Sequence, residues 1–153
     1  MVRFRALELA SGAAPPSAVE ERFSFQLEGD RVIGRFDRVD ETAAGTVITD
    51  YKSGGDVRDP ARARQKARDS LQLAVYAMAH EARTGALPAA VALHFLDTGM
   101  VGRVSPEARK IDAARAAVRV AAEGIRQAEF PTRPDRFACA GCPFRRICPD
   151  AAA

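Results

Sequence analysis

Polar and apolar residues alternate along the first third of the chain in a way that predicts three β-strands. The alternation is clearest over residues 22–27, where phenylalanine, phenylalanine and leucine occupy every second position. A Glu-Gly-Asp sequence at 28–30 then favours a hairpin turn. We expect a second strand over 31–40 and a third over 46–52, which starts with an apolar, β-branched run.

The rest of the chain alternates between helical and strand patterns. Residues from about 60 to 83 have helical periodicity, with an apolar stripe formed by Leu71, Val75 and Met78. Thr84 and Gly85 would end this helix. Strands are expected over 89–96 and 100–104, followed by a helix capped by Ser105 that extends to about residue 128. These elements predict an α/β fold with a mixed central sheet of about five strands flanked by helices.

Two carboxylates and a lysine are the candidate chemical groups on these strands. Residues i and i+2 of a strand point to the same face, so Asp50 and Lys52 would project together, away from Tyr51. If the second and third strands pair, Asp37 can reach the same divalent cation as Asp50, while Lys52 orients the attacking water or neutralises a phosphate. The alternative interpretation is that Asp50 and Lys52 form an exposed ion pair at a sheet edge.

The surroundings of these groups can also be predicted. Alternation in the second strand would place Asp37 on the face of Ile33 and Val39, where it would be partly shielded. Gln72 and Tyr76 are four residues apart, so they share one helix face. They could line the same site; alternatively, Tyr76 belongs to the core and Gln72 to the surface.

Composition and charge narrow the class of protein. The chain has 153 residues, of which 47% are hydrophobic, and this is enough for one domain with a core. No apolar run is long enough to span a membrane, and we expect a cytoplasmic location with no membrane partner. The formal net charge is +3, and its basic excess gathers just after the third strand, in Arg58, Arg62, Arg64, Lys66 and Arg68. Arg62, Arg64 and Lys66 could hold DNA phosphates, or they could form a solvated helix face.

Three motifs occur in order: Gly34-x-x-Asp37-Arg38-x-Asp40, then Asp50-Tyr51-Lys52-Ser53-Gly54, then Gln72-Leu73-x-x-Tyr76, followed by clustered cysteines. This order resembles the RecB/AddB-type branch of the PD-(D/E)XK nuclease superfamily, over about residues 20–149. The resemblance implies a restriction-endonuclease-like core. It implies that Asp37, Asp50 and the backbone carbonyl of Tyr51 bind Mg²⁺ or Mn²⁺, and that Lys52 is the catalytic lysine. It also implies that Gln72 and Tyr76 line the site and contact DNA.

The chain departs from this family at both ends. About nineteen residues precede Glu20, and they lack the helical segment with a metal-binding histidine or glutamate that the family usually has. Glu20 or Glu21 could match a glutamate near the first strand, but a surface charge explains either one. We therefore expect a fragment of a larger protein, with a remnant or linker at 1–19, a nuclease core at 20–137 and a cysteine loop at 138–153.

The cysteine loop holds all the cysteines of the chain, Cys139, Cys142 and Cys148. In the similar family such a triplet joins an upstream cysteine to bind a [4Fe–4S] cluster, which usually takes four thiolates. A fourth cysteine is absent from this sequence, so we expect an incomplete cluster site here and a complete one only in a full-length parent. Three free thiols in a loop are the alternative.

The sequence therefore predicts a metal-dependent DNA nuclease. The resemblance further implies an exonuclease that acts on single-stranded DNA or duplex ends during recombination or repair, together with a helicase domain in the same chain or in a partner. The alternative is a DNA-binding or interaction module without turnover, because the upstream ligand segment and the fourth cysteine are missing.

Overall fold

The computed structural model describes residues 14–54 and 56–152. The remnant expected at the N-terminus therefore lies largely outside the described residues. The chain divides into two compact units, Met1–Arg119 and Val120–Ala153. The first unit contains the sheet and its helices, and the second contains the end of the last long helix and the cysteine loop.

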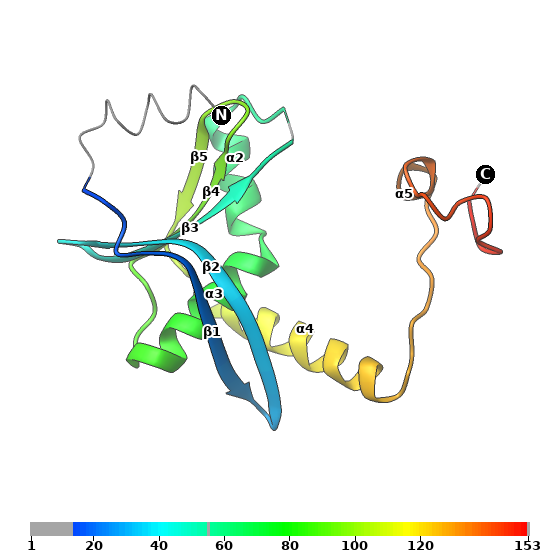
Figure 1. Cartoon of the computed structure of the whole chain (residues 1–153), viewed down its shortest axis with the longest axis horizontal. Coiled ribbons are helices and arrows are strands. Elements are labelled where there is room, and N and C mark those ends of the chain that lie inside the picture. The colour runs from blue at the N-terminus through cyan, green and yellow to red at the C-terminus, as the bar shows by residue number, and fades with distance from the viewer. Residues whose placement is uncertain (1–13, 55, 153) are drawn as a thin grey trace. The chain divides into compact units, whose positions relative to one another are not determined.

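Five strands and four helices are formed by the described residues. The strands are β1 (Ala18–Leu27), β2 (Asp30–Thr42), β3 (Gly45–Lys52), β4 (Ala90–Phe95) and β5 (Met100–Val104). The helices are α2 (Pro60–Arg68), α3 (Leu71–Thr84), α4 (Ala108–Arg126) and α5 (Arg136–Ala140). Figure 1 shows that β1 and β2 form a long, curved hairpin. No described helix is both long and apolar enough to cross a bilayer.

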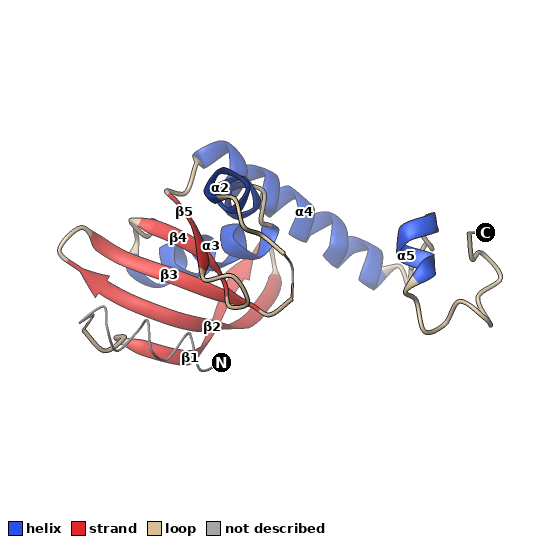
Figure 2. Cartoon of the chain, turned by 90° about the horizontal axis from the view of Figure 1, so that it is seen from above, coloured by secondary structure: helices blue, strands red, loops and turns tan. Residues whose placement is uncertain are grey.

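The strands form one mixed sheet in the order β1-β2-β3-β4-β5. The pairs β1–β2, β2–β3 and β4–β5 are antiparallel, and β3–β4 is parallel. Parallel neighbours need a long crossover connection, and here α2 and α3 provide it. Both helices pack on one side of the sheet (Figure 2). The predicted α/β fold with a mixed five-stranded sheet is therefore confirmed.

The single helix expected over residues 60–83 is instead two helices, which corrects the prediction. Asp59 caps α2, and its carboxylate accepts hydrogen bonds from the backbone of Ala61 and Arg62. Helix α2 ends at Arg68, and Ser70 begins α3 by accepting a hydrogen bond from the Leu73 amide. A serine side chain that accepts a hydrogen bond from a free backbone amide starts a new helix. Such a cap does not alter the spacing of apolar residues, so the sequence pattern did not reveal the break.

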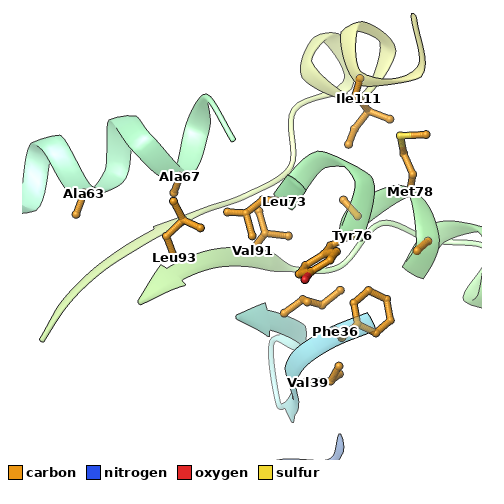
Figure 3. Packing of buried hydrophobic residues seen from close by; sticks show 14 of the residues in the cluster. Phe36, Val39, Ala63, Ala67, Leu73, Tyr76, Met78, Val91, Leu93 and Ile111 are labelled. Carbon is orange, nitrogen blue, oxygen red and sulfur yellow. The ribbon is translucent and has the colours of Figure 1, made fainter. Parts of the chain in front are cut away.

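The expected apolar stripe of this region was correct only in part. Met78 is buried as expected, but Leu71 is 51% exposed. The buried positions of α3 are Leu73, Tyr76, Ala77, Met78, Ala79 and His80. Because α3 starts at Leu71, its first residue lies at the rim, and the face that includes Leu73 and Tyr76 turns towards the sheet (Figure 3). The expected end at Thr84 is confirmed, since Gly85 adopts a left-handed conformation with φ 82°.

The last long helix begins later than expected. Helix α4 starts at Ala108 rather than just after Ser105, and its buried residues are Ile111 and Ala114. Both belong to the core cluster that also contains Phe36, Ile48 and Leu73.

Regular alternation in β2 breaks at Asp37. Phe36 and Val39 are 1% and 2% exposed, although an ideal strand would point them to opposite faces, and Ile33 is 71% exposed. The β1–β2 ladder passes from Val19–Arg38 to Glu21–Phe36 and skips the position between them. Glu20, on the opposite strand at that position, has φ 54°. The expected common face of Ile33 and Val39 was therefore wrong, whereas Asp37 is half-buried as expected.

Candidate active site

The two candidate carboxylates meet where the β2–β3 ladder ends. Its last pair is Arg38–Thr49, and continuing the register by one residue would bring Asp37 opposite Asp50. Instead of forming a further backbone pair there, Asp37 uses its Oδ2 to accept a hydrogen bond of 2.9 Å from the Tyr51 amide. The ladder thus gives way to a side-chain contact, and this break places Asp37 beside the end of β3.

Asp50 is buried although it carries an ionisable group. Its residue surface is 1% exposed, and Lys52 Nζ lies 2.7 Å from Oδ2. Burial raises the pKa of the Asp50 carboxyl above its usual value; the Lys52 ammonium opposes the rise, and the negative charge of Asp37 adds to it. Within the described part of the chain, the buried Oδ2 accepts no well-aligned hydrogen bond. The positive group at this oxygen is the Lys52 ammonium, and a metal ion would have to displace it.

This carboxylate and three other side chains of β3 and α3 form a closed ring of polar contacts. Lys52 Nζ, which pairs with Asp50 Oδ2, donates to Gln72 Oε1 at 2.7 Å. Gln72 Nε2 donates to the Tyr76 hydroxyl at 2.9 Å, and that hydroxyl donates to Asp50 Oδ1 at 3.4 Å. The Lys52 side chain is 39% exposed. The ring therefore joins a buried carboxylate to the protein surface.

Tyr76 combines a core ring with a polar end. It is 5% exposed, and its ring contacts Phe23 and Phe36 edge-on at centroid distances of 5.8 and 5.3 Å. Burial, aided by the charges of Asp37 and Asp50, raises the pKa of Tyr76 to about 12. The hydroxyl is therefore protonated at neutral pH and can donate to Asp50. The burial matches the alternative that placed Tyr76 in the core and Gln72 at the surface, yet both residues still contribute to the ring.

The aromatic support of Tyr76 was missed in the sequence. Phe23 lies opposite Gly34 in the β1–β2 ladder. A Cβ added at Gly34 would lie 2.3 Å from Cζ of Phe23. The absence of a side chain at Gly34 lets the Phe23 ring lie across β2 and contact Phe36 at 4.6 Å. A glycine facing an aromatic residue across a predicted hairpin was the signal that could have identified this contact.

The interpretation of Asp50 and Lys52 as an exposed edge pair does not hold. The two residues do form an ion pair, but Asp50 is buried and β3 lies between β2 and β4. At the end of the same strand, Gly54 donates its amide to Asp97 Oδ2 at 2.6 Å. Sequence reasoning did not single out Asp97, which follows β4 and lies far from Gly54 in the chain.

The donors at this site fit a hard divalent cation. Such ions take one or two carboxylates and complete their shell with water and phosphate oxygens. Asp50 offers a buried oxygen that accepts no aligned hydrogen bond from the described residues, and the charge of Asp37 disfavours its ionisation unless a positive charge is near. Among the described residues, no group of three or more histidine, cysteine, aspartate or glutamate side chains is arranged to hold a metal. A cation here would therefore need oxygens from water or substrate.

The predicted basic residues lie on α2, away from the ring. Arg62, Arg64 and Lys66 are exposed, whereas Ala63 and Ala67 are buried. Helix α2 packs mainly on β5, and the ring is built on β3 and α3. At 100° per residue Arg62 and Lys66 share one flank of α2, and Arg64 lies on the other. The structure does not bring these three residues into the ring.

The cysteine loop belongs to the second compact unit. Cys139 lies in α5, and Cys142 and Cys148 follow it. All three are half-buried free thiols. Cys139 Sγ accepts a hydrogen bond from the Ala152 amide at 3.4 Å. The described residues therefore show the thiols as separate groups, not gathered into a metal-binding group.

Glu20 and Glu21 of β1 both make surface ion pairs, with a residue of β2 and a residue of α3. Glu20 lies 2.6 Å from Arg35, and Glu21 lies 2.9 Å from Arg83. Both carboxylates are more than a third exposed. These contacts favour the surface-charge explanation over a role as metal ligands.

The chain belongs to the PD-(D/E)XK nuclease superfamily, whose family model matches residues 1–149. The resemblance of the three motifs to this superfamily is thereby confirmed at the level of the superfamily. A search of curated protein sequences found no match.

Two solved structures share the fold. The crystal structure of SSO0001 has a TM-score of 0.58 and 14% identity, and the alignment covers 99% of this chain and 69% of that one. A protein from Eubacterium rectale named "Putative exonuclease" has a TM-score of 0.59 and 15% identity, and the alignment covers 95% of this chain and 57% of that one. At these identities the similarity concerns the fold alone.

Proposed function

We propose that this chain is a divalent-metal-dependent nuclease that hydrolyses phosphodiester bonds in DNA. The observation that carries the proposal is the ring of Asp50, Lys52, Gln72 and Tyr76 beside Asp37, in a chain of a nuclease superfamily. A buried carboxylate with an unfavourable charge is typical of a functional site, because a fold gains no stability from it.

Asp37, Asp50 and the Tyr51 carbonyl would hold Mg²⁺ or Mn²⁺. When bound, the ion supplies activation of a water and neutralisation of the scissile phosphate. Lys52 now lies on Asp50 Oδ2, so its ammonium must leave that oxygen before the oxygen can bind a cation. Gln72 Oε1 accepts from the same ammonium and would keep it near the attacked phosphate. Tyr76 remains a hydroxyl and fixes the other carboxylate oxygen.

The finer assignment follows the sequence motifs. We infer a RecB/AddB-type nuclease that works with a helicase domain, acts as an exonuclease in recombination or repair, and is cytoplasmic. Gln72 and Tyr76, together with Arg62, Arg64 and Lys66, are proposed DNA contacts. For Cys139, Cys142 and Cys148 we propose an incomplete [4Fe–4S] site, which a further cysteine would complete.

The test is the cleavage of a labelled single-stranded DNA by the whole chain with Mg²⁺ or Mn²⁺. We expect the wild type to cut and Asp50→Asn to lose about 10²-fold or more in rate, as is usual when a group that stabilises the transition state is removed. Asp112→Asn is the matched control, because Asp112 is an exposed carboxylate on α4. Equal rates for wild type and Asp50→Asn would remove Asp50 from the mechanism.

The alternative of a binding module without turnover gives a different pattern. It predicts salt-sensitive DNA binding in EDTA and no cutting at any Mn²⁺ concentration. A calorimetric Mn²⁺ titration of wild type and Asp50→Asn separates the two, because only the nuclease proposal requires an Asp50-dependent binding isotherm.

A further inference from the structure

One face of the β1–β2 hairpin carries three exposed arginines at cross-strand positions. Arg22 lies directly opposite Arg35, and Arg31 lies opposite Gln26. All four residues are exposed. Like charges that face each other across an antiparallel pair destabilise it. The arrangement therefore costs the hairpin stability, and packing alone does not account for it.

The core-facing side of the same hairpin is apolar. Phe23, Phe25 and Val32 pack against the core cluster. Because side chains alternate along a strand, these residues fix Arg22, Arg31 and Arg35 on the opposite, solvent face. The strand alternation therefore places all three arginines on one surface, whichever rotamers their side chains adopt.

The ion pair on this surface is itself exposed to solvent. Arg35 pairs with Glu20 at 2.6 Å, and both side chains are more than half exposed. The arginines line a shallow hollow together with Ser24 and with Ile33, which is 71% exposed. Arg31 and Arg35 are four residues apart on β2, a span of about 13 Å.

The geometry points to the arginine face (Arg22, Arg31 and Arg35) as a second nucleic-acid surface, which binds the phosphate backbone of a DNA strand outside the cleavage site. Guanidinium groups match phosphate geometry, and a ladder that follows a strand suits an extended polyanion better than a small one. Ser24 and Ile33 provide few groups that could read base edges, so the contact would be independent of sequence.

The location links this face to the candidate active site. Arg35 and Asp37 are two residues apart on β2, which is about 7 Å along a strand. The ring itself lies on the core-facing side of the sheet with α3, so a DNA strand that extends beyond the site would have to pass around the sheet to reach the arginines. The choice of DNA as the polyanion depends on the proposed function, whereas the arginine face itself does not.

The test is fluorescence anisotropy of a labelled single-stranded oligonucleotide with the whole chain in EDTA at several salt concentrations. Each phosphate contact to a single strand contributes about 0.7 to the slope of log affinity against log salt. The double variant Arg22→Gln/Arg35→Gln should therefore reduce the slope by about 1.4, and affinity at 0.1 M salt by about 25-fold. Arg22→Gln alone should lose about fivefold.

Two single variants sharpen the test. Arg109→Gln removes the same charge from an exposed position of α4 and should change affinity far less than Arg22→Gln. Glu20→Gln frees Arg35 from its carboxylate and should tighten binding. Far-UV circular dichroism confirms that each variant is folded.

Affinity of the double variant equal to that of the wild type would overturn the inference. A double variant that binds vesicles of anionic phospholipid more weakly than the wild type, but binds DNA equally well, would also overturn the inference. The readout is separate from the nuclease test: weakened DNA binding by the double variant without any Asp50-dependent cutting supports the arginine face and refutes the nuclease proposal. Asp50-dependent cutting together with unchanged DNA binding by the double variant supports the nuclease proposal and refutes the arginine face.

Discussion

At the scale of single residues, Asp50 is the position where stability and chemistry conflict. Burial of a carboxylate disfavours its charged form. Lys52 compensates through its ion pair, but the pKa of Asp50 remains raised because burial dominates and Asp37 adds repulsion. Folding thus disfavours the ionised form of this carboxyl. This is the expected condition of a carboxylate prepared for a positive ligand.

This conflict predicts the effect of Asp50→Asn on stability. A carboxyl whose pKa is raised by folding contributes stability below its unfolded value, and that contribution is lost as pH rises through the folded value. At pH 7 without metal, Asp50 is therefore unfavourable, and its neutral isostere should increase the free energy of unfolding. The gain should shrink as the pH falls towards the usual aspartate value of 3.8.

Urea denaturation in EDTA at several pH values measures this difference. Asp112→Asn should show no such pH-dependent gain, because Asp112 is exposed. Destabilisation by Asp50→Asn at pH 7 would mean that the Lys52 ion pair outweighs the cost of burial.

At the scale of elements, α2 depends on a glycine in β5. A Cβ added at Gly102 would lie 2.0 Å from the Ala63 carbonyl oxygen, which is backbone and cannot rotate away. The buried alanines of α2, Ala63 and Ala67, and Gly102 on β5 together permit this close approach of helix and strand. The position of α2, and thus of its basic residues, is set by small residues rather than by large apolar ones.

We therefore expect Gly102→Ala to force α2 away from β5 and to destabilise the chain by about 1–3 kcal/mol, as overpacking does. Thermal unfolding followed by circular dichroism measures the loss. Gly124→Ala is the matched control, because its new Cβ would be 3.5 Å from the nearest backbone oxygen. Within helix α4 that change should stabilise by about 0.5–1 kcal/mol. A neutral Gly102→Ala would show that α2 can shift freely.

At the scale of the whole molecule, the site is made by three segments that are distant in sequence. Strand β2 brings Asp37, β3 brings Asp50 and Lys52, and α3 brings Gln72 and Tyr76. A ligand that binds across these segments stabilises the folded chain as a whole, because the unfolded chain has no preformed site.

Mn²⁺ should therefore raise the melting temperature of the wild type. At a concentration of 100 times Kd the stabilisation is about 2.7 kcal/mol. Asp37→Asn should reduce this shift because it removes one proposed ligand, and Asp112→Asn should keep it. Differential scanning fluorimetry with an Mn²⁺ series provides the comparison. An undiminished shift in Asp37→Asn would exclude Asp37 as a ligand.

Much of the fold could be predicted from the local pattern of the sequence. Alternation predicted β1, β2 and β3 to within a few residues, because one face of each strand must meet the core. It did not predict the helix break at Ser70, since capping is a side-chain hydrogen bond that leaves apolar periodicity unchanged. It also misplaced part of the buried face of α3, because packing against the sheet decides which of several apolar positions are covered.

The identity of the candidate site residues also followed from the sequence, since Asp50-x-Lys52 and Gln72-x-x-x-Tyr76 are fixed by strand and helix periods. Their catalytic and binding roles remain predictions. Only the tertiary structure decided that these four side chains close into one ring. It also decided that Asp37 bonds to Tyr51 where the ladder stops, and that three arginines share a hairpin face. The reason is physical: periodicity determines which way a side chain points along its own element, whereas register and packing between elements determine what it meets.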